Sequence, residues 1–82
     1  MTKVYSFWDE GGCLYFGTRE EATNAARNTA NFSGEAVQVT VDEVGSRPGE
    51  GKSYLYARLL NGTAWATGKR SYFTVRPSRG RA

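Results

Sequence analysis

The sequence contains no histidine and a single cysteine, Cys13. A chain without histidine lacks the commonest general base and the commonest metal ligand. One cysteine cannot form an intrachain disulfide or supply the several ligands of a zinc site. The acidic pairs Asp9-Glu10, Glu20-Glu21 and Asp42-Glu43 are neighbours in sequence, which point apart on a strand. We therefore expect a protein that is not an enzyme and holds no cofactor and no metal.

Long apolar runs are also missing, and none approaches the roughly 20 residues of a membrane span. Residues 1–5 enter a strand-like pattern directly, without an apolar signal segment. We therefore expect a cytoplasmic protein with no membrane contact. The 82 residues suit one α+β domain over residues 1–76, followed by a flexible basic tail over 77–82. A domain of this size has little room for a deep pocket, so a flat binding surface is expected.

Acidic residues are absent from the second part of the chain. Residues 1–50 hold four basic and eight acidic side chains, a net of −4, whereas residues 51–82 hold seven basic and no acidic ones, a net of +7. The two parts sum to the formal net charge of +3. Such a separation favours a polyanionic partner for one face, although a dispersed, solvated surface is the plainer interpretation.

The first half of the sequence predicts a β-hairpin followed by a helix. Residues 3–8 and 13–16 are rich in β-branched and aromatic types, and the acidic, glycine-containing segment 9–12 between them predicts a turn. Thr18 and Glu21 form a capping box at the start of the helix. The small residues of that helix follow helical spacing and form one stripe: Ala22, Ala25, Ala26, Thr29 and Ala30.

Gly34 is the predicted helix end, and a strand should follow it. Val37, Val39 and Val41 alternate with polar residues, which is typical of a half-buried strand. Val44 falls out of phase with the three valines. This change of phase predicts a bulge or the end of the strand.

The remaining residues are expected to form strands only. Residues 53–60 are the first strand, and Asn61-Gly62 predicts a type I′ turn into a second strand over 63–67. Residues 68–70 should turn again before a last strand over 71–76. The predicted fold is an antiparallel β-sheet of five to six strands with a single helix packed on one face, in the order ββαββββ.

The predicted hairpin sorts side chains onto two sheet faces. A two-residue turn places Leu59 opposite Ala64 on one face and Arg58 opposite Trp65 on the other. The first face is aliphatic and suits the alanine stripe of the helix, so the second is left uncovered. The candidate partner-binding residues on and beside that second face are Tyr54, Tyr56, Arg58, Trp65, Lys69, Arg70, Tyr72 and Arg76.

Aromatic rings beside arginines are typical of protein interfaces and of nucleic-acid platforms. Bases of DNA or RNA stack on such rings at about 1–3 kcal/mol each, and arginines contact phosphates. Three other interpretations stay open: the aromatic face is the core, it is the seam of a homodimer, or its tyrosines merely stabilise strands. The sequence alone leaves both a monomer and a homodimer possible.

The capped, alanine-rich helix that follows a hairpin resembles a pattern of small phage and mobile-element proteins, carried here by residues 15–22, Ala25-Ala26 and 37–41. In size and layout the chain is similar to several anti-CRISPR proteins. That resemblance implies an inhibitor in the cytoplasm of a host bacterial cell, which binds a CRISPR–Cas effector complex and blocks target-DNA binding or nuclease recruitment. The positive net charge departs from the acidic inhibitors that imitate DNA.

Overall fold

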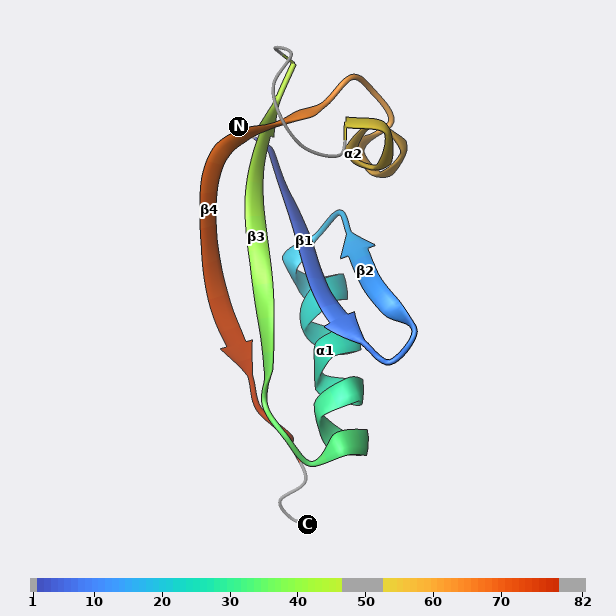
Figure 1. Cartoon of the computed structure of the whole chain (residues 1–82), viewed down its shortest axis with the longest axis vertical. Coiled ribbons are helices and arrows are strands. Elements are labelled where there is room, and N and C mark those ends of the chain that lie inside the picture. The colour runs from blue at the N-terminus through green and yellow to red at the C-terminus, as the bar shows by residue number, and fades with distance from the viewer. Residues whose placement is uncertain (1, 47–52, 79–82) are drawn as a thin grey trace.

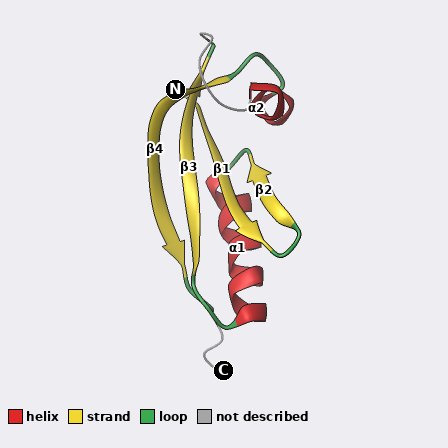
Figure 2. Ribbon diagram, in the orientation of Figure 1, coloured by secondary structure: helices red, strands yellow, loops and turns green. Residues whose placement is uncertain are grey.

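The computed structural model describes residues 2–46 and 53–78, which form a four-stranded antiparallel sheet and two helices (Figures 1 and 2). In chain order the elements are β1 (Thr2–Asp9), β2 (Gly12–Phe16), α1 (Arg19–Ser33), β3 (Val37–Gly45), α2 (Ser53–Leu60) and β4 (Trp65–Val75). The strands lie in the order β2-β1-β3-β4, and every neighbouring pair is antiparallel. The predicted α+β class is confirmed. The predicted strand number was slightly too high, and a second helix takes the place of one predicted strand.

The predicted N-terminal hairpin is confirmed. β1 and β2 pair antiparallel from Tyr5 opposite Phe16 to Asp9 opposite Gly12. The Asp9 carboxylate accepts a 2.7 Å hydrogen bond from the Gly11 N–H, and Gly12 has a φ of 123°, which side chains other than glycine rarely adopt. The turn therefore forms where the acidic and glycine residues predict it.

Helix α1 has the predicted start, face and end. The Thr18 hydroxyl accepts a hydrogen bond of 3.1 Å from the Glu21 N–H, as an N-cap should. Ala22, Ala26 and Ala30 are buried against the sheet. Gly34 ends the helix in the left-handed conformation, with a φ of 80°.

Strand β3 explains why Val44 falls out of phase. Its register against β4 shifts between Asp42 and Val44, but the extra residues are in β4, because the pairing of β3 with β1 is regular through Val44. Val44 is out of phase with the other valines because it points to the opposite face of a regular strand. Val39 packs with Phe7 on the side covered by α1, whereas Val44 packs with Val4 and with residues of and after α2. The strand therefore contributes to two cores on opposite sides of the sheet.

The prediction of a strand over residues 53–60 was wrong, because these residues form helix α2. Tyr56 and Leu60 pack in the same cluster as Val4 and Val44. A helix holds two residues four positions apart about 6 Å apart along its axis, whereas a strand would hold them roughly 13 Å apart. Leucine, alanine and arginine also favour a helix. The expected hairpin turn at Asn61-Gly62 is the helix end: Asn61 has a φ of 58°, and the Gly62 N–H donates to the Ala57 carbonyl at 3.1 Å.

The predicted turn at residues 68–70 was also wrong. Residues 65–75 form the single strand β4, and Gly68 interrupts it with a φ of 97°. Four positions separate Ala66 from Arg70 along β4, whereas their β3 partners, Val44 and Asp42, are two positions apart. The extra residues make a bulge that a lone glycine allows.

The two helices lie on opposite faces of the sheet. Helix α1 covers one face through a core that includes Phe7, Ala26 and Val39. Helix α2 covers only one end of the other face (Figure 1). There Tyr56 packs on Val4. The remainder of that second face has no helix over it among the described residues. No helix in the described part of the chain is long and apolar enough to cross a membrane.

The start of the predicted C-terminal tail is bound to α1. The Ser78 N–H donates to the Asn31 side-chain oxygen at 2.7 Å, and the Asn31 amide donates to the Ser78 hydroxyl at 3.2 Å. Residues 79–82 of the predicted tail lie outside the described residues.

Candidate functional site

The candidate site is the part of the sheet that faces away from α1 and is not covered by α2, called here the open face. Strand pairing places its residues on one side, because partners in a register share a face. Ser6 is paired with both Tyr15 and Thr40, Trp8 with Cys13, and Thr40 with Tyr72. The open face consists of Ser6, Trp8, Cys13, Tyr15, Gln38, Thr40, Asp42, Arg70, Tyr72 and Thr74.

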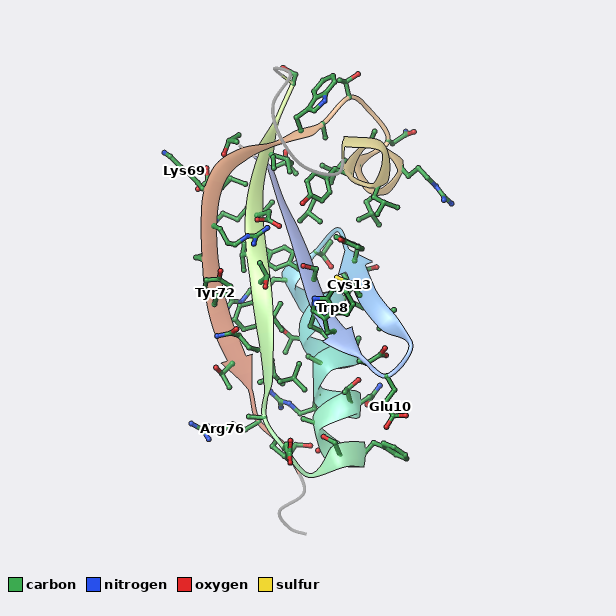
Figure 3. The ribbon with its side chains drawn as sticks, in the orientation of Figure 1. Trp8, Glu10, Cys13, Lys69, Tyr72 and Arg76 are labelled. Carbon is green, nitrogen blue, oxygen red and sulfur yellow. The ribbon has the colours of Figure 1, made fainter. Side chains whose placement is uncertain are left out.

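Two large rings of the open face are exposed to solvent. Trp8 is 73% exposed and Tyr72 is 54% exposed. Trp8 stands on β1 and Tyr72 on β4, with β3 between them, so the two positions are about 10 Å apart or more. Figure 3 shows Tyr72 along β4 together with Lys69 and Arg76, and Trp8 across the sheet beside Cys13.

Asp42 joins three elements beneath this face. Its carboxylate is buried and accepts from the Tyr56 hydroxyl at 3.2 Å and from Arg70 Nε at 2.7 Å. A second Arg70 nitrogen, Nη2, lies 3.4 Å from the other carboxylate oxygen. Helix α2 and strands β3 and β4 are therefore connected through one charged group.

This network shifts the pKa of both of its other members. Burial, the charge of Asp42 and the hydrogen bond to Asp42 raise the pKa of Tyr56 to about 12. The hydrogen bond to Asp42 and the charge of Asp42 raise the pKa of Arg70 above its ordinary value, with a smaller contribution from the Tyr72 hydroxyl. Arg70 therefore stays a cation, and Tyr56 stays a neutral donor, at any physiological pH.

A cavity of about 500 Å³ opens on the open face next to this network. Trp8 on β1 stands at its rim, and Arg70 lines it from β4. The rings of Tyr15 and Tyr56 meet edge to face, with centroids 6.3 Å apart, and close the side below α2. The other lining residues are Ser6, Cys13, Thr40, Asp42, Ala66 and Gly68.

Ser6 lies at the floor of the cavity and is only 7% exposed. Its hydroxyl makes no hydrogen bond to any side chain or backbone group within residues 2–46 and 53–78. A buried hydroxyl without a partner costs about 1–3 kcal/mol, and buried polar groups in folded proteins are nearly always hydrogen-bonded. The cavity therefore presents a polar group that a ligand could satisfy.

The predicted partner-binding residues do not form one surface. The hairpin that was expected to bring them together is the helix α2, so the pairing of Arg58 with Trp65 was wrong. Tyr56 is buried beneath α2, Arg58 is exposed on that helix, and Trp65 is half-buried at the start of β4. The side chain of Tyr54 lies outside the described residues.

The structure does bring the β4 members of the predicted set together. Lys69, Arg70 and Tyr72 are exposed on β4, and Arg76 follows its last residue (Figure 3). Arg70 and Tyr72 belong to the open face. Their role in binding a partner stays a prediction.

Sequence reasoning missed the β1 and β2 contributions to this site. Trp8, Ser6 and Cys13 were assigned to an N-terminal hairpin with no stated role in binding. The alternation of Phe7 with Trp8 and of Ser6 with Tyr5 contained a signal, because a strand with one helix-covered face points every second residue away from that helix. Only the strand order, with β1 next to β3, brings them near Arg70.

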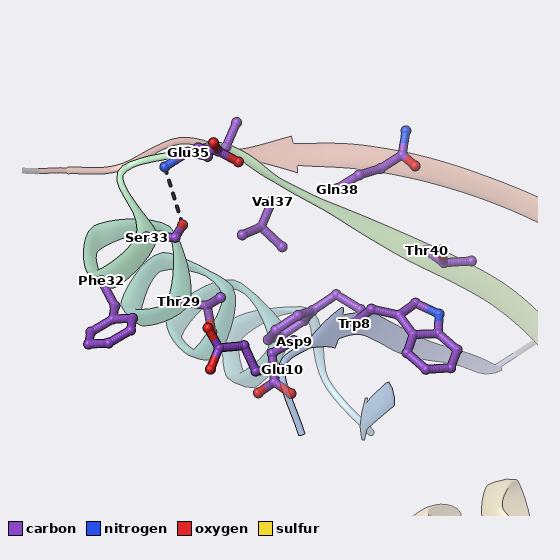
Figure 4. A pocket seen from close by; sticks show the side chains of 12 residues that line it. Trp8, Asp9, Glu10, Thr29, Phe32, Ser33, Glu35, Val37, Gln38 and Thr40 are labelled. Carbon is purple, nitrogen blue, oxygen red and sulfur yellow. Dashed lines mark hydrogen bonds between the residues drawn. The ribbon is translucent and has the colours of Figure 1, made fainter. Parts of the chain in front are cut away.

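A second groove, of about 700 Å³, lies where β1 diverges from β3. Pairing between these strands ends at Ser6 opposite Thr40, and the groove continues beyond that pair to the end of α1. Figure 4 shows Phe32 at one side of this groove and the Trp8 ring directed away from Asp9 and Glu10. These carboxylates, together with Glu35, make the groove acidic, so it does not suit a polyanion.

Comparison of this chain with protein-family models, with curated proteins and with solved structures finds no match. Within the described ranges, no group of three or more cysteine, aspartate or glutamate residues is arranged to hold a metal ion.

Proposed function

We propose that the protein binds single-stranded nucleic acid on its open face and catalyses no reaction. The observation that carries this proposal is the pair of exposed rings, Trp8 and Tyr72, on a sheet face that α1 leaves uncovered. Exposed rings on a sheet stack with unstacked bases, and every base offers a π-face. A duplex keeps its bases stacked, which favours a single strand as the ligand.

Cations of β4 supply the contacts to phosphate in this proposal. Lys69 and Arg76 are exposed and form no ion pair with any described acidic residue, and Arg70 lies between them in sequence. Because the Asp42 carboxylate neutralises the positive charge of Arg70, the net attraction for phosphate comes mainly from Lys69 and Arg76. A single nucleic-acid strand bound across the sheet would place its bases on the two rings and its phosphates along β4.

Tryptophan fluorescence provides the direct test. The chain has two tryptophans, so a Trp65→Phe background leaves Trp8 as the sole reporter. An oligothymidylate of about 12 nucleotides should quench the fluorescence of Trp8. Trp8→Ala should weaken binding about 5- to 150-fold, measured by the fluorescence anisotropy of a labelled oligonucleotide. Phe32→Ala is the matched control, because Phe32 is 88% exposed but lies on α1 at the acidic groove.

Salt dependence tests the second half of the proposal. Two phosphate contacts, by Lys69 and Arg76, predict that the logarithm of the binding constant falls against the logarithm of salt concentration with a slope of about −1.4. Replacing Lys69 and Arg76 by glutamine should bring this slope close to zero. The proposal is refuted when the oligonucleotide causes no quenching and no change in anisotropy at micromolar protein and low salt.

An effector complex of a CRISPR–Cas system is the second candidate partner, supported by the resemblance to anti-CRISPR proteins. The surface carries both charges, basic along β4 and acidic at Asp9, Glu10 and Glu35, which suits a protein interface as well as a nucleic acid. Pull-down with purified effector, prepared with and without its guide RNA, separates the two ligands. Capture only with RNA present would favour nucleic acid, capture without RNA would favour protein, and no capture would remove this candidate.

Self-association through β4 is the third candidate. β4 is an eleven-residue strand at the edge of the sheet, and in the described part of the chain no strand pairs with its outer side. Static light scattering at high protein concentration distinguishes a dimer from a monomer. A monomer throughout would remove this candidate without affecting nucleic-acid binding.

A further inference from the structure

We infer that the cavity beside Arg70 binds one unstacked guanine base of the bound strand. This inference rests on the proposed function, because it names the base that the open face selects. It starts from three features of the cavity: a guanidinium fixed by Asp42, a buried hydroxyl with no partner among the described residues, and an exposed tryptophan at the rim. Each of them corresponds to a chemical feature of guanine.

The guanidinium of Arg70 is fixed by Asp42 and keeps further N–H donors for a ligand. It carries five N–H donors. Two of them face the Asp42 carboxylate, through Nε at 2.7 Å and Nη2 at 3.4 Å, which fixes the plane of the group. The three remaining N–H groups belong to Nη1 and Nη2, and one of these groups also meets the Tyr72 hydroxyl. The end of the guanidinium formed by Nη1 and Nη2 carries two parallel N–H donors. Two parallel N–H donors are what the adjacent O6 and N7 acceptors of guanine require.

The Asp42 carboxylate also favours a base over a phosphate in the cavity. A phosphate placed in the cavity would approach the buried carboxylate of Asp42, which already neutralises Arg70. A neutral base that carries both donors and acceptors suffers no such repulsion. The cavity therefore suits a base, and phosphates remain on the outer side of β4.

The hydroxyls of the cavity match the donor side of guanine. Ser6 is buried and has no hydrogen-bond partner in the described ranges, and Thr40 lies opposite it in the strand register. Both hydroxyls can accept from the N–H groups that guanine carries. Adenine lacks the O6 acceptor, and pyrimidines lack N7, so they leave an Arg70 donor or the Ser6 hydroxyl unpaired.

The ring of Trp8 completes the site. It stands at the rim of the same cavity and is 73% exposed, so it can cover an inserted base or stack with the next one along the strand. Purines have the larger ring surface for such stacking. The volume of about 500 Å³ leaves room for one base and its sugar.

The experiment compares oligothymidylates of about 12 nucleotides that carry one central deoxyguanosine, deoxyadenosine or deoxycytidine. Wild-type protein should bind the deoxyguanosine strand about 5- to 150-fold more tightly than the others. Ser6→Ala should reduce this preference, and Arg70→Lys, which keeps the charge but loses the two-pronged donor edge, should abolish it. Binding of plain oligothymidylate should change less than about threefold in both variants, since Lys69, Arg76 and Trp8 are retained.

Cys13 gives a readout in the unmodified protein, because this single cysteine lines the cavity and is partly exposed. At saturating ligand, the strand with deoxyguanosine should slow alkylation of Cys13 by iodoacetamide more than plain oligothymidylate does. Should Arg70→Lys fail to fold, this protection and the Ser6→Ala comparison decide the question.

The outcomes separate the two proposals. Equal affinity for all four strands, together with equal protection of Cys13, overturns the guanine site and leaves the proposed function standing. A guanine preference that survives both Ser6→Ala and Arg70→Lys overturns the assignment to this cavity. Failure of every oligonucleotide to bind overturns the proposed function itself, and the guanine site with it.

Discussion

Tyr56 is the side chain whose change tests the described structure most directly. It is 3% exposed, packs with Val4 and Val44, and donates its hydroxyl to Asp42 at 3.2 Å. Tyr56→Phe keeps the ring and removes only the hydroxyl. Hydrogen bonds to charged groups contribute about 1.5–3 kcal/mol, and this one is longer than is usual for a carboxylate acceptor. We therefore expect the variant to lose about 1.5 kcal/mol of unfolding free energy at pH values near 8.

The difference in unfolding free energy between the wild type and Tyr56→Phe should then shrink as the pH rises. The pKa of Tyr56 is raised from 10.0 to about 12 in the folded protein. Between these values the unfolded chain has lost the phenolic proton and the folded protein has not, so the free energy of unfolding falls with increasing pH. Two pKa units correspond to at most about 2.7 kcal/mol, which only the wild type loses. The gap of about 1.5 kcal/mol should therefore close and then reverse as the pH approaches about 12.

Urea unfolding followed by circular dichroism, from about pH 8 to about pH 12, measures both proteins under the same conditions. The two proteins differ only at residue 56, so subtracting the curves isolates Tyr56. A gap of constant size across this range would refute the reasoning. It would mean that the Tyr56 hydroxyl does not lie buried beside Asp42, and that α2 does not pack as described.

Two further changes test the two places where helices meet the rest of the fold. Ala26→Leu should lower the free energy of urea unfolding by about 1–3 kcal/mol, because Ala26 is fully buried against the sheet. Asn28→Leu is the control, because Asn28 is exposed on the same helix. Equal stability of the two variants would contradict the packing of α1. Asn61→Ala should cost about 1 kcal/mol in thermal unfolding, since Asn61 has a φ of 58°, whereas Asn61→Gly should be close to neutral. A hairpin turn at this position would also penalise alanine, so amide exchange protection of residues 55–60 in a helical pattern is the discriminating measurement.

The first half of the fold was predictable because its local signals agree with one another. The turn at Gly11 and Gly12, the cap at Thr18 and the stop at Gly34 each specify one backbone conformation. The alanine stripe between these signals has only one face to bury. Where every local preference points to the same element, tertiary packing has nothing to override.

The second half was mispredicted because its signals are compatible with two structures. Tyrosines and leucines alternate over residues 53–60, which is typical of a strand, yet Tyr56 and Leu60 are also four residues apart, which suits a helix. The left-handed conformation of Asn61 serves a hairpin turn and a helix end equally well. The phase change at Val44 indicated that the sheet has a second covered face, but it did not identify the cover.

The candidate site was predictable only where it lies on one strand. Arg70 and Tyr72 share a face of β4 by simple alternation. Trp8 and Ser6 join them because β1 lies next to β3 in the sheet, and the order of strands is not encoded in any short segment. The pairing of Arg70 with Asp42 spans 28 residues, so no local pattern reveals it.

The bulge in β4 connects the second core to the candidate site. If β4 continued regularly from Ala66 opposite Val44, Gly68 would lie opposite Asp42 and Arg70 opposite Thr40. Asp42 would then be a buried carboxylate with only Tyr56 to bond, which is strongly unfavourable. The shift at Gly68 lets Ala66 remain with the residues around α2 while Arg70 reaches Asp42 and Tyr72 lies opposite Thr40. One glycine with a φ of 97° thus allows the strand to serve a packed core at one end and a cation on the open face at the other.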